Sequence, residues 1–373
     1  MSDDSINMNK RLVFTVTNDL TYDQRMIRIC TSLAKQGYTV TLIGRTLPDS
    51  LPLAKMEFHQ KRLACFFSKG FLFYAEYNIR LFFSLLFVKA DLFCAIDLDT
   101  ILPVLVVSSL RKKGRVYDAH ELFCEMKEIV SRKAVYKTWK AIERFSVPMF
   151  RQGYTVNHII ADELRKMYGV DYLVIRNIPL MMPLAIPTKK DKYILYQGAV
   201  NEGRCFETLI PAFKEIDCKL IVCGDGNFMD EARKLVRFHH LENKISFTGK
   251  VPPAALKDYT LNATIGVTLF DAAGLSNYYS LANRFFDYMH AGIPQVCVDY
   301  PVYRSIIDKH RFALLTNELD SSSLAKQINR LLHDEPLYQQ LQANCLTARK
   351  ELNWQNEENT LISFYNQIVP TVE

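Results

Sequence analysis

Apolar residues in this chain follow two alternating patterns: short continuous runs, and longer segments in which they recur every three or four positions. The first short run, residues 11–17, indicates a buried strand, and residues 25–36 then carry apolar side chains at helical spacing up to Gly37. Residues 40–43 supply the next strand. This order predicts a strand, helix, strand unit of a parallel sheet, in which ligands bind at the carboxyl ends of the strands.

The pattern is interrupted between residues 179 and 192, where three prolines are followed by a group of lysines. A new strand and helix pattern begins at residue 193, so we predict two domains, residues 1–185 and 186–352. Residues 353–373 are largely helical in pattern, and we expect this helix to pack back on the first domain because its large apolar side chains need a partner. These side chains are Trp354, Leu361, Phe364 and Tyr365.

The composition bears on the cellular compartment of the protein and on whether it holds disulfides or a zinc ion. The 373 residues carry a formal net charge of +6, and the nine cysteines are scattered without a Cys-x-x-Cys pair, so neither a disulfide framework nor a zinc site is expected. The N-terminal segment is polar and lacks the apolar core of a signal peptide. The longest uncharged apolar runs fall well short of the ~20 residues that span a bilayer. We therefore expect a cytoplasmic protein without a transmembrane helix.

Basic and aromatic residues are interleaved between residues 55 and 151. One interpretation is that this segment contacts an anionic membrane surface. The other is that the aromatic residues are core and the basic residues are the solvated faces of ordinary helices. Nucleic acid is not expected as a partner, because no recognised binding motif accompanies the charge. The residues concerned are Lys61, Arg62, Lys69, Arg80, Lys89, Arg111, Lys112, Lys113, Lys133, Lys137 and Lys140, with Phe66, Phe67, Phe71, Phe73, Phe82, Phe83 and Trp139.

Polar residues follow two of the predicted strands in the first half of the chain. Asn18 and Asp19 lie in the loop after the first strand, and His120 comes three positions after a short strand predicted at residues 115–117. These positions lie at the carboxyl ends of strands, where parallel sheets bind ligands. From its position alone, His120 is either a structural or helix-capping residue or a group placed for chemistry.

The second half contains glycine loops and a charged helix. Gly198 opens a loop that ends at Arg204 before a helix, and such a loop offers main-chain N–H groups to an anion. Arg284 and Asp287 lie three positions apart, and therefore on one face of a helix that Gly292 ends. Together they could hold a diphosphate and a ribose, or they could form an ordinary surface ion pair.

Residues 283–294, Asn-Arg-Phe-Phe-Asp-Tyr-Met-His-Ala-Gly-Ile-Pro, resemble the donor-site segment of the retaining family 4 glycosyltransferases, or glycosyl transferases group 1, which have the GT-B architecture. The Gly-Asp-Gly turn at residues 224–226 and the run Tyr-Asp-Ala-His-Glu-Leu at residues 117–122 are similar to segments that lie near the donor in that family. The resemblance extends over residues 11–368 and is strongest over residues 193–300.

The resemblance implies an α/β protein with two Rossmann-like domains whose parallel sheets face a cleft, and a C-terminal helix that crosses back to the first domain. It implies a metal-independent, hexosyltransferase-like enzyme that moves a sugar from a UDP- or GDP-sugar to a glycan or lipid-linked acceptor, without a cofactor. Surface polysaccharide or lipopolysaccharide biosynthesis on the inner face of the membrane is the expected setting. The implied catalytic residues are His120, Arg204 and Asp287; the donor contacts are Gly198, Arg204, Gly224, Asp225, Lys250, Arg284 and Asp287; the acceptor contacts are Asn18 and Asp19.

Three departures from the family pattern keep other functions open. Tyr279 stands where the family usually has Glu, Ala199 stands where it has a basic residue, and the first loop lacks a Gly-Gly pair. These departures favour a non-catalytic subunit that binds nucleotide sugars for a polysaccharide assembly complex. A nucleotide-sugar epimerase of the same architecture is a third candidate, although no additional carboxylate pair is evident. Asp97 and Asp99 form an Asp-x-Asp pattern, but they lie in the first half, away from the donor segments, and we expect no metal site.

Overall fold

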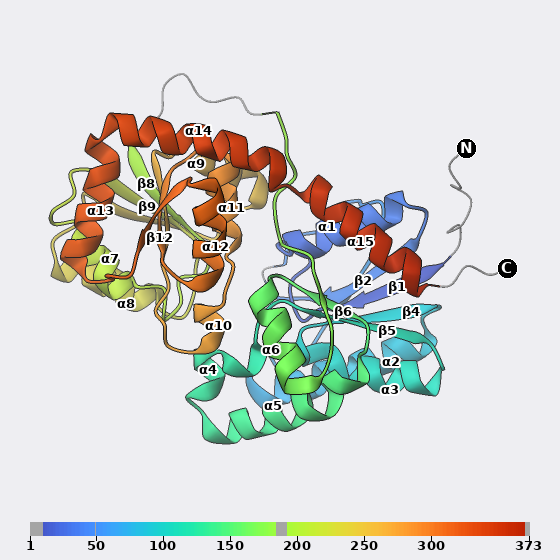
Figure 1. The fold of residues 1–373 in the computed structure, drawn as a ribbon. Coiled ribbons are helices and arrows are strands. Elements are labelled where there is room, and N and C mark those ends of the chain that lie inside the picture. The colour runs from blue at the N-terminus through green and yellow to red at the C-terminus, as the bar shows by residue number, and fades with distance from the viewer. Residues whose placement is uncertain (1–9, 49, 184–191, 370–373) are drawn as a thin grey trace, which may run out of the picture. The chain divides into compact units, whose positions relative to one another are not determined.

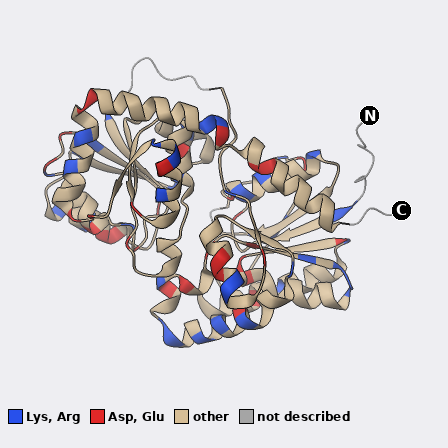
Figure 2. Cartoon of the chain, in the orientation of Figure 1, with Lys and Arg blue, Asp and Glu red and all other residues tan. Residues whose placement is uncertain are grey.

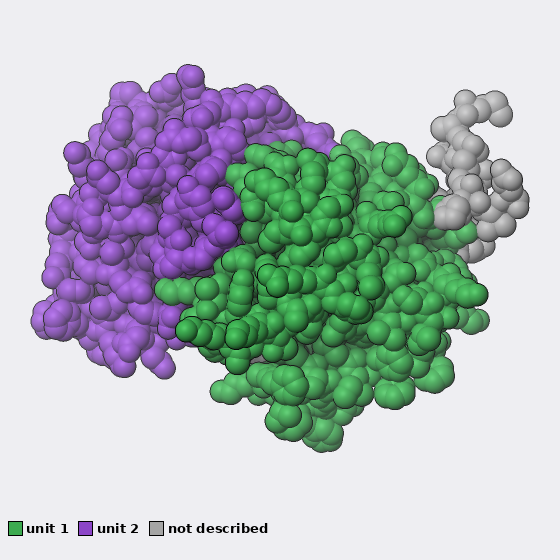
Figure 3. Space-filling view, turned by 60° about the horizontal axis from the view of Figure 1, so that its bottom comes forward, with its two compact units in different colours: residues 1–177, 357–373 green, residues 178–356 purple. Residues whose placement is uncertain are grey.

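The computed structural model describes residues 10–48, 50–183 and 192–369, and the chain divides into two compact units. Unit 1 comprises residues 1–177 and 357–373, and unit 2 comprises residues 178–356; the two are coloured separately in Figure 3. The domain boundary predicted between residues 185 and 186 lies outside the described residues. Along the chain, the division between the units falls at Asn177 and Ile178.

Unit 1 is built on a parallel sheet of seven strands in the order β3-β2-β1-β4-β5-β6-β7 (Figure 1). β1 pairs with β2 on one side and with β4 on the other, so the chain leaves these central strands in opposite directions. Ligands of open α/β sheets bind beside the carboxyl ends of the strands at such a reversal. The strands are β1 Arg11–Thr15, β2 Thr39–Arg45, β3 His59–Leu63, β4 Leu92–Ile96, β5 Gly114–Ala119, β6 Gly153–Thr155 and β7 Leu173–Val174.

Helices cover both faces of this sheet. Figure 1 shows α2, α3 and α5 on one face, and α1 with the C-terminal α15 on the other. α1 begins where Asp23 accepts a hydrogen bond from the main chain of Met26, which is a typical N-cap. The helices are α1 Gln24–Lys35, α2 Gly70–Phe87, α3 Ile101–Leu110, α4 Lys127–Val130, α5 Lys133–Ser146, α6 His158–Tyr168 and α15 Trp354–Ile368, with short 3-10 turns η1 Leu98–Thr100, η2 Phe123–Glu125 and η3 Val147–Met149.

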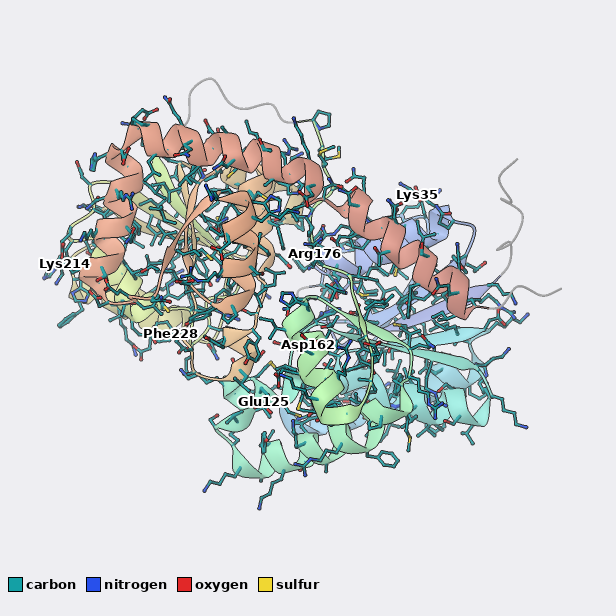
Figure 4. All side chains as sticks on the ribbon, viewed as in Figure 1. Lys35, Glu125, Asp162, Arg176, Lys214 and Phe228 are labelled. Carbon is teal, nitrogen blue, oxygen red and sulfur yellow. The ribbon has the colours of Figure 1, made fainter. Side chains whose placement is uncertain are left out.

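The helix α15 begins in unit 2 and ends in unit 1, where it supplies part of the core. The ring of Tyr365 is fully buried, lies 5.9 Å from that of Phe14, and has its hydroxyl 3.2 Å from that of Tyr154. Arg176, labelled in Figure 4, donates to the carboxylate of Glu357 on the same helix. Of the apolar residues of the last segment, Tyr365 thus has its partners in unit 1.

Unit 2 is built on a parallel sheet of six strands in the order β10-β9-β8-β11-β12-β13, again with a reversal beside its first strand, β8. In its core, Phe228, labelled in Figure 4, stacks on Phe206. The strands are β8 Tyr193–Gln197, β9 Lys219–Cys223, β10 Ile245–Gly249, β11 Ile265–Thr268, β12 Gln295–Val298 and β13 Ala313–Thr316. The helices are α7 Phe206–Ala212, α8 Met229–Phe238, α9 Pro253–Asn262, α10 Leu275–Tyr278, α11 Asn283–His290, α12 Pro301–His310, α13 Ser321–His333 and α14 Glu335–Glu351.

Both units are therefore Rossmann-like, and the α/β fold class predicted from the sequence is confirmed. In the described part of the chain, no helix has both the length and the apolar character that a bilayer crossing requires.

Candidate functional site

The centre of the candidate site in unit 2 is Arg284, the second residue of α11. Its side chain is buried, with 7% of the residue exposed, and its guanidinium lies 4.6 Å from the ring centres of both Tyr196 and Phe270. Its Nη atoms make long hydrogen bonds, 3.3–3.4 Å, to the hydroxyl of Tyr196 and to two main-chain oxygens. The Nε atom has no hydrogen-bond partner among the described residues.

No carboxylate of the described residues forms an ion pair with Arg284. The surface ion pair with Asp287 that was the alternative interpretation is therefore not formed. A buried cation whose partners are all neutral carries a large desolvation cost, and an anionic ligand would offset that cost. Arg284 is thus placed to bind an anion at the carboxyl edge of the sheet.

Arg204 lies beside Arg284, and the family resemblance implied both as donor contacts. Its guanidinium lies 4.4 Å from the ring centre of the same Phe270, and its Nη1 donates to Asn277 at 3.2 Å. Phe270 is 2% exposed, so one buried ring contacts both cations and holds their planes in place. The structure brings the two arginines together, and Phe270 is the residue that sequence reasoning missed.

Two glycine turns let the loops after β8 and β9 pack main chain against main chain. Gly198 has φ +126°, and a Cβ there would lie 3.0 Å from Nη1 of Arg284. Gly224 has φ +152°, and its Cβ would lie 1.8 Å from the carbonyl oxygen of Gly198. A side chain at position 224 would collide with main chain, and both glycines have φ values that residues with a side chain rarely adopt. Asp225 and Lys250 are exposed and follow β9 and β10, so both also lie at the carboxyl edge.

Asp287 lies one turn further along α11 and is half-buried. Its Oδ2 accepts from Nε2 of Gln197 at 2.8 Å, and the Oε1 of Gln197 accepts from the hydroxyl of Thr260 at 2.8 Å. These two hydrogen bonds fix the carboxylate of Asp287 beside the end of β8. Gln197 and Thr260 were not predicted as site residues, although a glutamine at the end of an apolar strand is the kind of signal that could have pointed to Gln197.

In unit 1, His120 is held between two carboxylates at the end of β5. Its Nε2 lies 3.0 Å from Oδ2 of Asp118, its Nδ1 lies 3.3 Å from Oδ2 of Asp97, and its main-chain N–H donates to Oδ1 of Asp97 at 2.8 Å. Arg25 forms a bidentate ion pair with Asp118, which is fully buried. Burial lowers the pKa of His120, but the two carboxylates more than offset this and raise it to about 9.

The imidazole of His120 is therefore charged at neutral pH and donates from both ring nitrogens. An imidazolium has no lone pair with which to accept a proton, so His120 is not a general base in this arrangement. Burial raises the pKa of Asp97 to about 6, and Asp97 has φ 54°, a conformation that is uncommon for a residue with a side chain. In this conformation Asp97 contacts both the main-chain N–H and the ring of His120, and so orients it.

Asn18 and Asp19, predicted to contact the acceptor, lie after β1. Asn18 is exposed and donates to Asp23 at 3.0 Å. Asp19 is 8% exposed, and its carboxylate accepts hydrogen bonds from Arg62, Ser50 and the main chain of Thr21. Asp19 thus ties the loop after β1 to β3 and to the segment that follows β2, and its acceptor role stays a prediction.

Asn18, Asp19 and His120 belong to unit 1, whereas the other predicted site residues belong to unit 2. Among the described residues, no group of three or more His, Cys, Asp or Glu side chains is arranged to hold a metal ion.

Residues 185–346 match the family model described as glycosyl transferases group 1. The matched segment lies within unit 2, residues 178–356. A curated relative, the N-acetylgalactosamine-N,N'-diacetylbacillosaminyl-diphospho-undecaprenol 4-alpha-N-acetylgalactosaminyltransferase of Campylobacter jejuni, is 25% identical over 151 residues, 40% of this chain. The match spans only 39% of that relative's length.

Solved structures resemble this chain over nearly its whole length. Sucrose-phosphate synthase from Thermosynechococcus elongatus aligns with a TM-score of 0.76 and 16% identity, covering 96% of this chain and 98% of that one. The Anabaena protein HepE, solved in complex with UDP-glucose, aligns with a TM-score of 0.73 and 12% identity, covering 96% and 99%. At this identity the likeness shows the fold, which is the GT-B architecture of two Rossmann-like domains.

Proposed function

We propose that this protein is a retaining glycosyltransferase that moves a sugar from a nucleotide-diphosphate sugar to a glycan or lipid-linked acceptor. The observation that carries the proposal is Arg284, a buried arginine without a carboxylate partner among the described residues, beside Arg204 and two glycine turns. The match of residues 185–346 to the group 1 family supports it. The UDP-glucose bound to HepE, a protein of the same fold, supports a nucleotide-sugar donor.

In this proposal the donor diphosphate occupies the carboxyl edge of the sheet in unit 2. Arg284 and Arg204 neutralise the charge that develops on the diphosphate as it leaves, which is electrostatic stabilisation by groups already in place. Asp287, held by Gln197, binds the ribose hydroxyls, while Gly224, Asp225 and Lys250 line the nucleotide. The two arginines serve in place of a metal ion, so we expect activity without added divalent cations.

The transfer itself needs no protein nucleophile. The acceptor hydroxyl oxygen forms a bond to the anomeric carbon on the face from which the diphosphate departs, and the bond from that carbon to the phosphate oxygen breaks. The hydroxyl proton passes to the departing diphosphate. Both ring N–H groups of His120 are engaged by Asp97 and Asp118, so in this proposal His120 contributes positive charge that favours the anionic leaving group and donates no hydrogen bond to the sugar.

The setting that we propose is the inner face of a membrane, in the assembly of a surface polysaccharide or lipopolysaccharide, with UDP- or GDP-hexose as the donor. The name of the Campylobacter relative describes transfer to a sugar carried on diphospho-undecaprenol, which supports a lipid-linked acceptor. A second candidate is a non-catalytic subunit that binds nucleotide sugars. Tyr279, just after α10 at the position where the family usually has Glu, favours it.

Donor hydrolysis tests the proposal. The purified protein is incubated with UDP-glucose, UDP-N-acetylglucosamine, UDP-N-acetylgalactosamine or GDP-mannose, and released nucleoside diphosphate is measured alongside binding by calorimetry. Arg284→Ala should abolish most release, while Arg237→Ala, an exposed arginine on α8 of the same unit, should leave it unchanged. Release that survives Arg284→Ala would contradict the proposed role of Arg284. Binding of a nucleotide sugar without turnover over a broad acceptor panel would favour the non-catalytic subunit.

A further inference from the structure

The helix α2 in unit 1 is apolar on two opposite faces. Phe73, Tyr77, Leu81 and Leu85 recur every four residues and are buried in the unit. The other face exposes Leu72, Ile79, Phe83 and Phe87, which are 54%, 59%, 55% and 83% exposed. A helix that is apolar all round is usually buried on all sides. Here the inner face packs in unit 1 and the outer face is open, which marks an interaction surface.

The loop before α2 extends this surface and is held in a defined conformation. Phe66 is 87% exposed and Phe71, at the start of the helix, is 78% exposed. The carboxylate of Glu76 accepts hydrogen bonds from the main-chain N–H groups of Phe66 at 2.9–3.0 Å and of Phe67 at 3.0 Å. Arg45 donates to the carbonyl oxygen of Ser68 at 2.6 Å. The aromatic rings therefore project from an anchored loop, which reduces the entropy lost when they are buried by a partner.

The charge around this surface is strongly positive. Residues 61–90 contain five lysines and arginines and one carboxylate, a net charge of +4. Lys69 directly precedes α2, Lys89 follows it, and Lys61 donates to Ser84 on the helix at 2.8 Å. Glu76 is paired with Arg80 at 2.8 Å, and Arg62 is paired with Asp19 outside this segment, so Lys61, Lys69 and Lys89 supply the positive charge of the surface. Figure 2 shows the positions of the lysines and arginines on unit 1.

We propose that the α2 face, defined as the outer face of α2 together with residues 64–72, docks on an anionic lipid bilayer. Phe66, Phe71, Phe83 and Phe87 enter the boundary between headgroups and acyl chains, and Lys61, Lys69 and Lys89 contact the headgroup phosphates. The surface carries highly exposed aromatic rings with cations nearby, such as Arg80 at 5.5 Å from the ring centre of Phe66. This is the arrangement of an interfacial helix, whereas a protein partner would need complementary acidic groups as well as a matching groove.

The α2 face is tied to the carboxyl edge of the same unit. The hydroxyl of Tyr77 donates to the carbonyl oxygen of Val16 just after β1, and Asn78 donates to that of Asp99 at 3.0 Å. Docking through this helix therefore fixes a bilayer against the element that supports the predicted acceptor loop. Binding of the α2 face to a bilayer does not require the transfer reaction. The idea that this binding brings the enzyme to lipid-linked acceptors rests on the proposed function.

Vesicle sedimentation of the full chain tests the proposal. Vesicles of phosphatidylcholine with about 30% phosphatidylglycerol are compared with phosphatidylcholine alone, at about 0.05 M and about 0.5 M salt. The double variant Phe66→Ser/Phe71→Ser probes the aromatic contacts, and Lys61→Gln/Lys69→Gln/Lys89→Gln probes the charge. Phe238→Ser is the matched control, because Phe238 is 77% exposed but lies on α8 of unit 2.

The wild type and Phe238→Ser should pellet with the anionic vesicles, and less at high salt. The double phenylalanine variant should bind on the order of a hundredfold more weakly, about tenfold for each ring. The lysine variant should bind neutral and anionic vesicles alike. Pelleting of the double variant like the wild type, or no pelleting of the wild type, would overturn the proposal. So would a change from dimer to monomer in the double variant without vesicles, because the face would then join two copies. Donor binding, measured on the same variants, should stay unchanged, so loss of membrane binding and loss of the proposed function are told apart.

Discussion

Asp97 and Asp118 hold the ring of His120 between them, and this arrangement, called here the His120 clamp, predicts a pH dependence that can be measured directly. Asp97 and Asp118 raise the pKa of His120 from its ordinary 6.5 to about 9, so about 97% of the rings are charged at about pH 7.5. The substitution Asp97→Asn removes one of the two carboxylates and keeps the shape of the side chain. The pKa of His120 should then fall to a value between 6.5 and 9, because Asp118 remains within 3.0 Å.

The raised pKa is also a contribution to stability, with a definite sign. A group that binds its proton more tightly in the folded state stabilises that state most fully below its unfolded pKa, and the contribution is lost as the pH rises through the folded value. For values of 6.5 and about 9, His120 contributes roughly 2.5 kcal/mol at about pH 7 and close to zero at about pH 10. The stability difference between wild type and His120→Gln should shrink by that amount over this range.

Two measurements check this. Nuclear magnetic resonance follows the ring of His120 between about pH 5 and pH 10, with His120→Gln identifying its signal among the eight histidines of the chain. Urea unfolding at several pH values gives the stability difference. A titration midpoint near 6.5 in the wild type, or a midpoint that Asp97→Asn leaves in place, would refute the clamp. Lys35→Gln, an exposed change on α1, serves as the control for general effects of charge.

Further predictions concern the two units separately. Arg204→Ala should lower the rate of donor hydrolysis about a hundredfold with little loss of stability, because it removes one cation from the diphosphate site; steady-state kinetics and thermal unfolding check both parts. Gly224→Ala should destabilise the protein by more than about 3 kcal/mol, because the new Cβ would meet the carbonyl oxygen of Gly198. Gly249→Ala has open space around its Cβ and should cost only about 1 kcal/mol, because of its positive φ. Urea unfolding measures both changes in the free energy of unfolding. Tyr365→Ala should cost about 3–5 kcal/mol in the same assay, because it leaves a cavity in the core of unit 1.

The sequence was sufficient to predict the fold. The alternation of strands and helices predicted both parallel sheets, and the glycine turns at Gly198 and Gly224 lie where the short motifs placed them. The pairing of Arg204 with Arg284 was predicted only through the family resemblance, since 80 residues separate them. The contact of Phe270 with both arginines could not be predicted, because an apolar residue after a strand is typical of any core.

Long-range contacts of charged groups could not be predicted. Arg25 and Asp118 are 93 positions apart, and only the folded sheet brings them together beneath His120. Asp97 was considered as part of a metal motif, yet its carboxylate contacts the histidine. Asp19 was assigned to the acceptor because it follows a strand, and the structure adds its ion pair with Arg62, 43 positions away. In each case the residue type indicated a polar site, while the partner depended on tertiary structure.

The last helix has a consequence for biosynthesis. Domains generally fold as units while the chain is being made, with the N-terminal one first. Unit 1 cannot be completed in this order, because Tyr365, which packs against Phe14 and Tyr154, is translated only after residues 178–356 of unit 2. The apolar residues that Tyr365 covers stay exposed until unit 2 has been translated, so deleting the α15 residues after 356 should impair the folding of unit 1, which is made first.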